Sequence, residues 1–429
     1  MSDSHEAAAP AVTIPAASAA WAGSGLLSLT GRPGGPGLGP PLALVEGVQA
    51  WADRLTERSA ALGVTVTVDP LALLAERAAV TGLSRGGDVS CGGGTRLLPS
   101  SDGWVAVSLT REDDWDLVAA WLGRAAPVAP GAWSTLAEAV AGSVCAELRA
   151  GATLLGLPVS VLDERRRPAP DPAAPDAAEG IHGIGARRIG PAPATRSLDG
   201  LVVVDLSSLW AGPLASRLLL RAGVRVVKVE STRRPDGARR GSPRFFGRLN
   251  GGKQSVALDF TATSGSRQLG ELVAGADVII TGSRPRALEQ LGLALEDRIG
   301  HGRPRVWLSI TGYGRGGPSG QRVAFGDDAA VAGGLVVRDA LGPCFCADAI
   351  ADPLCGLASA VAVLDALEAG GTWVLDASMA DIAGGLTGPG LPTAGLAAEP
   401  PPDPSDESGL EVHDLGADTE AVLASLARA

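Results

Sequence analysis

Small polar residues and arginines follow five apolar runs that are typical of buried strands. In a parallel sheet the carboxyl ends of the strands lie along one edge, where ligands bind. Backbone N–H groups of small residues, together with arginines, suit a ligand that carries phosphate. The segments concerned are Ser207–Gly212, Glu230–Arg234, Asp259–Thr261, Thr281–Arg284 and Thr311–Gly314. The sequence therefore predicts a phosphate-type ligand site at this edge, with ordinary loop composition as the alternative.

Two other pairs of residues could take part in chemistry. Asp327 and Asp328 are adjacent, and one of two buried neighbouring carboxyls can have a raised pKa. Capping a helix N-terminus is the more frequent use of such a pair. Cys344 and Cys346 are separated by one residue, with no histidine near them in the sequence. Buried strand cysteines are therefore the favoured interpretation over a thiol nucleophile.

The apolar runs alternate with helical patterns between residues 197 and 387. LVVVDLS (201–207) is nearly continuous, and the segment after it, 211–223, has leucines at helical spacing. Strands that alternate with helices predict an α/β fold with a Rossmann-like parallel sheet and helices on both faces. The predicted strands are 201–207, 224–230, 255–260, 276–282, 305–314 and 373–379, and the predicted helices are 211–223, 263–273, 287–291 and 353–369.

The N-terminal part has a different pattern. A hairpin is expected at 95–110, with Ser101–Gly103 as its turn, and a further strand at 157–164. Helical spacing is found at 42–61, 70–79, 113–123 and 135–151. We therefore expect a smaller α+β domain. The predicted divisions are a flexible N-terminus (1–18), the smaller domain region (19–164), a linker (165–196), the sheet domain (197–387) and a flexible proline-rich and acidic tail (388–429).

Composition limits the classes of partner. The chain has 429 residues and a net charge of −11, so its overall charge does not favour nucleic acid or an anionic membrane. Its N-terminus is acidic, where a signal peptide needs positive charge. The five cysteines include no C-x-x-C pair and the four histidines are scattered, so we expect no metal site. A cytoplasmic protein is expected.

Several motifs occur in the order of a known family. LDGLVVVDLSSLWAGPLASRLLLRAGVRVVKVE (198–230) resembles the opening of class III CoA-transferases, a family that also includes the α-methylacyl-CoA racemases. Later segments keep the family's order as far as residue 381. They are GRLNGGKQSVALDF (247–260), ADVIITGSRPRALEQLGL (276–293), LSITGYGRGGPSG (308–320), FGDDAAVAGGLV (325–336) and ADAIADPLCGLASAVAVLDAL (347–367).

The N-terminal region resembles the later half of the same family. WAGSGLLSLTGRPGGPG (21–37) is similar to the segment after the sheet's last crossover. DGWVAVSLTREDDWDLVAAWLG (102–123) and GLPVSVLDE (156–164) are similar to the start and end of the family's small domain. The usual order is therefore rearranged, and we take an ancestral fusion or permutation as a hypothesis.

The resemblance implies a CoA site at the strand ends. CoA or acyl-CoA is then a substrate, and no tightly bound cofactor is expected. Gly282, Gln290 and Thr311 stand where family members carry polar or basic residues, although arginines between 233 and 240 could still reach phosphates. The implied contacts are Trp210, Ala211, Leu258, Asp259, Phe260, Thr261, Ser283, Arg284, Thr311, Gly312 and Tyr313.

The resemblance also implies a nucleophilic aspartate. In this family an aspartate attacks an acyl-CoA thioester, and the enzyme is then converted to an aspartyl-CoA thioester that an acceptor carboxylate displaces. The aspartate is expected in a T-G-x-x-D-G-P-P segment, but the N-terminal copy reads TGRPGGPG, with Gly34 at that position. The second copy, GGLVVRDALGP (333–343), makes Asp339 the nearest carboxylate. We therefore expect Asp339 to be the nucleophile.

Three functions follow from the resemblance. The first is a CoA-transferase that moves CoA from an acyl-CoA to a carboxylic acid, acting as a homodimer or with a homologous subunit. The second is a catalytically inactive acyl-CoA-binding or partner subunit, which Gly34 favours. The third is a racemase or isomerase, which is disfavoured because Phe325 occupies the position of the family's histidine. Asp348 corresponds to the racemase aspartate, and capping the next helix is an equal alternative for it.

Overall fold

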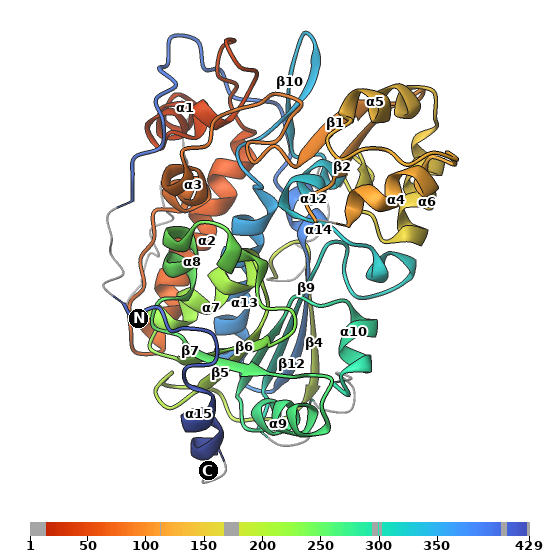
Figure 1. The fold of residues 1–429 in the computed structure, drawn as a ribbon. Helices are drawn as coiled ribbons and strands as arrows, with labels where there is room; N and C mark the ends of the chain where they lie inside the picture. Colours follow the sequence, from red (N-terminus) through yellow and green to blue (C-terminus); the bar gives the residue numbers. More distant parts are fainter. Residues whose placement is uncertain are drawn as a thin grey trace.

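The centre of the molecule is a seven-stranded sheet (Figure 1). The structure is a computed structural model that describes residues 14–111, 113–166, 180–293, 299, 303–404 and 410–426. The edge strand β4 runs antiparallel to its neighbour, and the other strands run parallel to one another. In sheet order the strands are β4 (Ile184–Gly190), β12 (Thr372–Ser378), β9 (Val306–Thr311), β8 (Val278–Thr281), β5 (Val202–Leu206), β6 (Arg225–Ser231) and β7 (Gln254–Leu258).

Both faces of this sheet are buried because its central strands are apolar at consecutive residues, which point to opposite faces. Val203 packs with α2 (Leu42–Ala61), α7 (Ala211–Arg221) and α13 (Ala351–Ala369). Val202 and Val204, which point the other way, pack with α9 (Thr263–Ala274) and α15 (Thr419–Leu426). The predicted mostly parallel sheet with helices on both faces is therefore confirmed.

A smaller domain lies beside the sheet (Figure 1). Three antiparallel strands form its sheet in the order β1-β2-β3, and three helices enclose a separate apolar core with Trp115, Val118 and Leu148. This arrangement confirms the predicted smaller α+β unit. Its elements are β1 (Thr95–Pro99), β2 (Trp104–Ser108), β3 (Val159–Val161), α4 (Asp114–Trp121), α5 (Trp133–Ala141) and α6 (Cys145–Leu155).

The remaining elements are a two-stranded hairpin, further helices and short 3-10 turns. Among the described residues, no helix is both long enough and apolar enough to cross a membrane. These elements are α1 (Ile14–Gly23), α3 (Pro70–Thr81), α8 (Pro243–Asn250), α10 (Pro285–Gln290), α12 (Gly326–Gly333), β10 (Val336–Asp339), β11 (Gly342–Phe345) and α14 (Met379–Gly384), with 3-10 turns at Leu26–Leu29, Gly237–Arg240 and Pro318–Gln321.

Three segments that the sequence predicted to be irregular contain regular structure. α1 begins at Ile14, within the predicted flexible N-terminus 1–18. β4 lies within the predicted linker 165–196, and its IGARRIG sequence lacks an apolar run because most of its residues are exposed. The predicted tail 388–429 includes α15, and the Asp418 carboxylate accepts a hydrogen bond from the Ser255 N–H of β7 at 2.7 Å. The tail thus satisfies backbone groups at the edge of the sheet. Residues 1–13 and 167–179 lie outside the described residues, and the mobility of these segments stays a prediction.

We expect Gly356→Val to destabilise the fold because α13 and α7 are in backbone contact at this position. A Cβ atom at residue 356 would lie 2.8 Å from the Ala211 carbonyl oxygen. Overpacking of this kind costs about 1–3 kcal/mol, which chemical denaturation can measure. Gly316→Ala is the control, since a Cβ there meets nothing within 4 Å. Equal stability of the two variants would contradict the close packing.

Candidate functional site

The structure places the predicted CoA contacts at the carboxyl ends of the parallel strands. Trp210 and Ala211 begin α7 after β5, and residues 258–261 end β7 and follow it. Residues 283–284 lie between β8 and α10, and residues 311–313 end β9. Parallel strands bring these loops to the same edge (Figure 1). The structure therefore gathers the predicted residues, although it does not test their contact with a ligand.

These residues differ in exposure. Asp259, Phe260 and Ser283 are half-buried, and Thr261 and Arg284 are exposed. The others are buried: Trp210, Ala211, Leu258, Thr311, Gly312 and Tyr313. Among the described residues, the Thr311 hydroxyl and the Tyr313 hydroxyl are buried without a hydrogen-bond partner. Buried polar atoms are normally satisfied, so these two hydroxyls mark places where a bound polar group could add a partner.

The arginines near the strand ends are partly engaged with protein carboxylates. Arg233 donates to Asp259 at 3.1 Å, and Arg239 donates to the buried Glu230. The Asp259 carboxylate also accepts hydrogen bonds from the Thr261 hydroxyl and N–H, which lower its pKa. Phosphate groups would therefore compete with existing ion pairs at Arg233 and Arg239.

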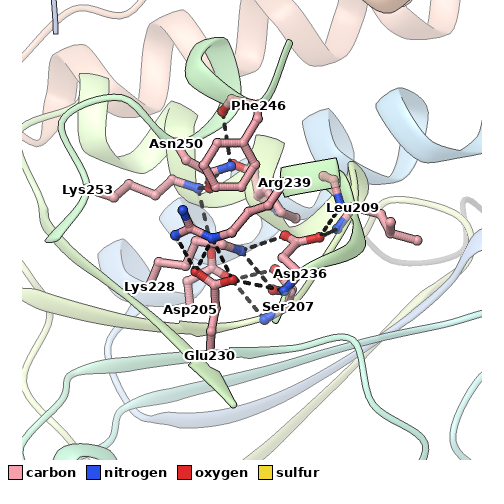
Figure 2. Close-up of polar contacts among 12 residues, drawn as sticks. Asp205, Ser207, Leu209, Lys228, Glu230, Asp236, Arg239, Phe246, Asn250 and Lys253 are labelled. Atoms are coloured by element: carbon pink, nitrogen blue, oxygen red, sulfur yellow. Dashed lines mark hydrogen bonds and ion pairs between the residues drawn. The ribbon is translucent and has the colours of Figure 1, made fainter. Parts of the chain in front are cut away.

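A buried charge network fixes the turn that carries Trp210. The chain has two lysines, Lys228 and Lys253, and both are in this network (Figure 2). Lys253 Nζ donates to Asp205 at 3.2 Å and to the Ser216 hydroxyl at 2.7 Å. Lys228 Nζ donates to Asp236 at 2.9 Å and to the Ser207 carbonyl at 3.1 Å. The loops after β5 and β6 are thus held together by buried ion pairs.

This network also holds a strained backbone. Leu209 has a φ of 69°, which is unfavourable for a residue with a side chain. Its N–H donates to Asp236 at 3.0 Å, and Figure 2 shows Leu209 beside Asp236 at one end of the network. The bond to a buried, charged acceptor stabilises the turn that presents Trp210 at the start of α7.

The charges in the network shift one another's pKa values. Burial alone would raise the pKa of Asp205, but Lys253 and Lys228 lower it to about 2. Burial lowers the pKa of Lys253 to about 7. The Asp205 carboxylate opposes this decrease, and the positive charge of Lys228 adds to it. Burial opposes the charge of Lys228 as well, but Asp205 and Asp236 raise its pKa. The two lysines therefore titrate in different pH ranges.

Trp210 links this turn to a residue of the N-terminal region. Its side chain is buried between Arg77 of α3, whose guanidinium carbon lies 5.3 Å from the indole centroid, and Phe245, at 5.2 Å between centroids. Among the described residues, the indole N–H of Trp210 has no hydrogen-bond partner. The predicted ligand turn is therefore covered by an aromatic side chain and a cation.

Arg77 also contacts an acidic cluster, which we define as the buried Asp327, Asp328 and Asp348 together with the half-buried Asp352. Arg77 Nε and Nη2 bind the two carboxylate oxygens of Asp348 at 2.7 and 2.5 Å. Asp327 accepts a hydrogen bond from the Ala349 N–H at 3.0 Å. Asp328 accepts one from the Phe325 N–H at 2.8 Å. The four carboxyls come from the start of α12, the loop after β11 and the first turn of α13.

The cluster depends on unusual backbone geometry. Ala347 and Ala349, on either side of Asp348, have φ values of 57° and 43°, a region that side chains disfavour. Gly326 is needed because a Cβ there would collide with the Asp352 carboxyl and the Ala349 carbonyl oxygen. The Gly326 N–H instead donates a hydrogen bond to Asp352.

The acidic cluster has carboxyls that hold protons near neutral pH. Burial raises the pKa of Asp352 to about 7. The Arg77 cation opposes this rise, and the charges of Asp327 and Asp348 add to it. Burial raises the pKa of Asp328 to about 7 and that of Asp327 to about 6. Groups with such values at strand or helix ends are candidates for chemistry. Sequence reasoning had considered Asp327, Asp328 and Asp348 as candidates, but it missed Arg77 and Asp352.

Three predictions about individual residues can be compared with these contacts. Asp328 does cap α12 through its bond to the Phe325 N–H, as predicted. Asp348 does not cap α13, because both of its oxygens bind Arg77; that prediction was wrong. Cys344 lies in β11 and Cys346 follows it, both buried, and burial raises their pKa values to about 11 and 12. They are therefore poor thiolate nucleophiles.

Asp339, the predicted nucleophile, lies at the end of β10 in the β10–β11 hairpin. Its Oδ2 accepts a hydrogen bond from Arg32 Nε at 2.9 Å, and its Oδ1 accepts one from the Leu341 N–H at 2.9 Å. Its side chain is 25% exposed. The structure thus places Asp339 against the N-terminal segment that contains Gly34, and its catalytic role stays a prediction.

A cavity of about 530 Å³ opens near the carboxyl ends of β9 and β12. Arg165, Tyr313, Asp376 and Asp381 line it together with glycines of residues 180–185 and 314–316. Arg165 is bound to Asp381 through two hydrogen bonds at 2.8 and 2.5 Å. Of the predicted CoA contacts, Tyr313 is the one that lines this cavity.

Comparisons with known proteins identify relatives of part of the chain. A family model described as CoA-transferase family III matches residues 198–415. A probable fatty acyl-CoA transferase of Mycobacterium tuberculosis is 34% identical over 135 residues, which are 30% of this chain and 34% of that protein. The succinyl-CoA:glutarate CoA-transferase of Homo sapiens is 32% identical over 148 residues, 33% of this chain and 34% of that protein.

The chain spans about a third of the length of these curated relatives. Among solved structures, a CAIB/BAIF family protein from Brucella suis is 29% identical. The match has a TM-score of 0.40 and covers 46% of this chain and 55% of that one.

We expect lysine-selective NMR to resolve the two buried lysines. With 15N-labelled lysine, one side-chain signal should titrate near pH 7 and disappear in Lys253→Met, while the Lys228 signal stays protonated well above that pH. Because the pKa of Lys253 is about 7 when folded and 10.5 ordinarily, the unfolded chain binds more protons between these values. The folded state therefore gains stability as the pH rises from 7 toward 10.5, by about 1.4 kcal/mol per pH unit at most.

Denaturant titrations at several pH values test this linkage. The gain in stability between pH 7 and 10 should be present in the native chain and absent in Lys253→Met. Arg267→Met is the control, since Arg267 is an exposed cation paired with Glu271. Two lysine signals that both titrate above pH 10 would contradict the effect of burial on Lys253.

Proposed function

Because the chain belongs to CoA-transferase family III, we propose that it moves CoA from an acyl-CoA thioester to a carboxylic acid through an aspartyl-CoA intermediate. An aspartate attacks the thioester carbonyl, which forms a mixed anhydride and releases CoA thiolate. The thiolate attacks the aspartyl carbonyl, which releases the first acid and leaves CoA bound as a thioester. The acceptor carboxylate then reverses these two steps, so the thioester bond is conserved.

One observation carries this proposal: a half-buried carboxyl of the matched region, Asp352, lies at the start of α13 against the Gly326 N–H. With its pKa raised to about 7, this carboxyl is more basic than an exposed aspartate and is still partly ionised at neutral pH. Higher basicity and loss of water from the carboxylate both favour attack on a thioester. Backbone N–H groups of the adjoining helix starts can stabilise the oxyanion that forms.

Asp339 is the second candidate for the nucleophile. Each of its oxygens already accepts a hydrogen bond, one of them from the Arg32 cation. A carboxylate oxygen that accepts a hydrogen bond from a cation is less available for attack on a thioester. These contacts favour Asp352, and the sequence pattern favours Asp339.

The substrates and the assembly form part of the same proposal. Curated relatives include a succinyl-CoA:glutarate and a formyl-CoA:oxalate CoA-transferase, so short carboxylic acids and their thioesters are suitable first probes. We expect CoA to lie along the strand ends from Trp210 to Tyr313, with no tightly bound cofactor. A homodimer, or a pair with a homologous subunit, is the expected assembly.

Intact-protein mass spectrometry after mixing with a panel of acyl-CoA thioesters tests the mechanism. We expect a covalent adduct of the mass of CoA on the native chain and on Asp339→Asn, and no adduct on Asp352→Asn. Asp365→Asn is the matched control, because Asp365 lies on the same helix and pairs with Arg54 and Arg58 instead. Peptide mapping of the adduct identifies the modified residue.

The alternatives give different results. Loss of the adduct in Asp339→Asn and its survival in Asp352→Asn would establish the nucleophile that the sequence predicts and reject Asp352. Measurable CoA binding without an adduct from any thioester would reject the transfer mechanism and favour a binding subunit. Circular dichroism confirms that each variant is folded before its adduct is measured.

A further inference from the structure

Arg77 joins two parts of the chain that are distant in sequence. It lies on α3, outside the matched residues 198–415, and its partner Asp348 is 271 residues away. Its guanidinium binds Asp348 through two hydrogen bonds and lies beside the Trp210 ring. Asp348 has no exposed area, whereas the Arg77 side chain is 30% exposed. One arginine of the N-terminal region therefore contacts both the acidic cluster and the predicted ligand turn.

The charged groups around Arg77 are mostly carboxyls. Asp348 faces it from the loop after β11, Asp327 from α12 and Asp352 from α13. The Cys91 thiol also lies near, and its pKa is raised by burial and by the charges of Asp348 and Asp327. On α3 itself, the neighbouring Glu76 is engaged with Arg217 and Arg248. Arg77 is thus the cation that compensates this side of the cluster.

This arrangement has a direct electrostatic consequence. A cation within about 4–6 Å favours the ionised form of a carboxyl and lowers its pKa by about 1–3 units. Arg77 lowers the pKa values of both Asp327 and Asp352, against the effects of burial and of the neighbouring carboxylates. Without Arg77, Asp348 would be a buried carboxylate without its charge partner, and the remaining carboxyls would retain their protons to higher pH.

We propose that Arg77 is a positioning residue of the site, which holds the Asp348 carboxylate in place and controls whether Asp352 carries its proton. The inference rests on the proposed function, in which Asp352 must be ionised to attack the thioester. In this proposal the positive charge of Arg77, which belongs to the N-terminal region, is required for the chemistry of the matched region. Arg77 acts through its ion pair with Asp348 and through the electrostatic effect of its charge on Asp352. It does not touch the reacting atoms.

Carbon-13 NMR of aspartate labelled at the side-chain carboxyl tests the inference without any substrate. In the native chain, the signal that disappears in Asp352→Asn should titrate near pH 7. In Arg77→Gln the same signal should titrate about 1–3 units higher. Arg77→Lys keeps a positive charge, and we expect a smaller shift there because lysine lacks the planar fork that binds both oxygens of Asp348.

Arg58→Gln is the matched control. Arg58 also connects the N-terminal region to α13, through Asp365 and Glu368, and makes no ion pair with the acidic cluster. Its loss can lower stability, but it should leave the titration of Asp352 unchanged. A shift of equal size in Arg58→Gln would show a general loosening of the contact between the two regions, and it would overturn the specific role of Arg77.

The pH dependence of adduct formation provides the catalytic readout. The rate of adduct formation should rise with pH as Asp352 ionises, and in Arg77→Gln this rise should move up by the same number of units as the NMR midpoint. A loss of rate at every pH, with an unmoved midpoint, would overturn the inference. If no thioester gives an adduct but the NMR midpoint still moves, the proposed function is rejected and the control of Asp352 by Arg77 is retained.

Discussion

The ion pair between Arg77 and Asp348 is the interaction on which the arrangement of the candidate site depends. It places a cation from α3 among carboxyls that belong to the loop after β11, to α12 and to α13. A buried carboxylate is tolerated only when its charge is compensated. The loop around Asp348 includes two residues with positive φ, and the ion pair helps to offset that strain. The same guanidinium lies against Trp210, so the turn after β5 is positioned by it as well.

The network around Lys228 and Lys253 and the acidic cluster serve different purposes because their charges balance differently. Around β5 and β6, Asp205, Asp236 and Glu230 face Lys228, Lys253 and Arg239. Equal numbers of opposite charges make a network that fixes loops. In the acidic cluster, three carboxyls, Asp327, Asp348 and Asp352, lie around Arg77. Burial, together with this excess of carboxyls, raises the pKa values of Asp327 and Asp352 so that they keep protons near neutral pH. That is the condition under which a carboxyl can change its state during a reaction.

The sequence predicts the sheet well because its strands have a local signature. β5, with VVVDL, is apolar on both faces and is followed by a helix with an apolar stripe. β4 has no such signature, since an antiparallel edge strand can be polar on both sides. The ends of the strands are predictable for the same reason, because parallel strands bring their loops to one edge. The sequence pattern favoured Asp339 and did not single out Asp352, since burial and charge partners, which decide the state of a carboxyl, are not visible in the sequence.

The pairing of Arg77 with Asp348 has no local sequence signal, because 271 residues separate them. Other polar residues of the N-terminal region also satisfy groups of the matched region. The Ser108 hydroxyl donates to the Asp328 carboxyl at 2.9 Å, and the Thr30 hydroxyl accepts a hydrogen bond from the Ala347 N–H at 3.1 Å. The N-terminal region is therefore part of the wall of the acidic cluster. Because the N-terminal region and the matched region belong to one chain, the charge of the cluster is set within a single polypeptide.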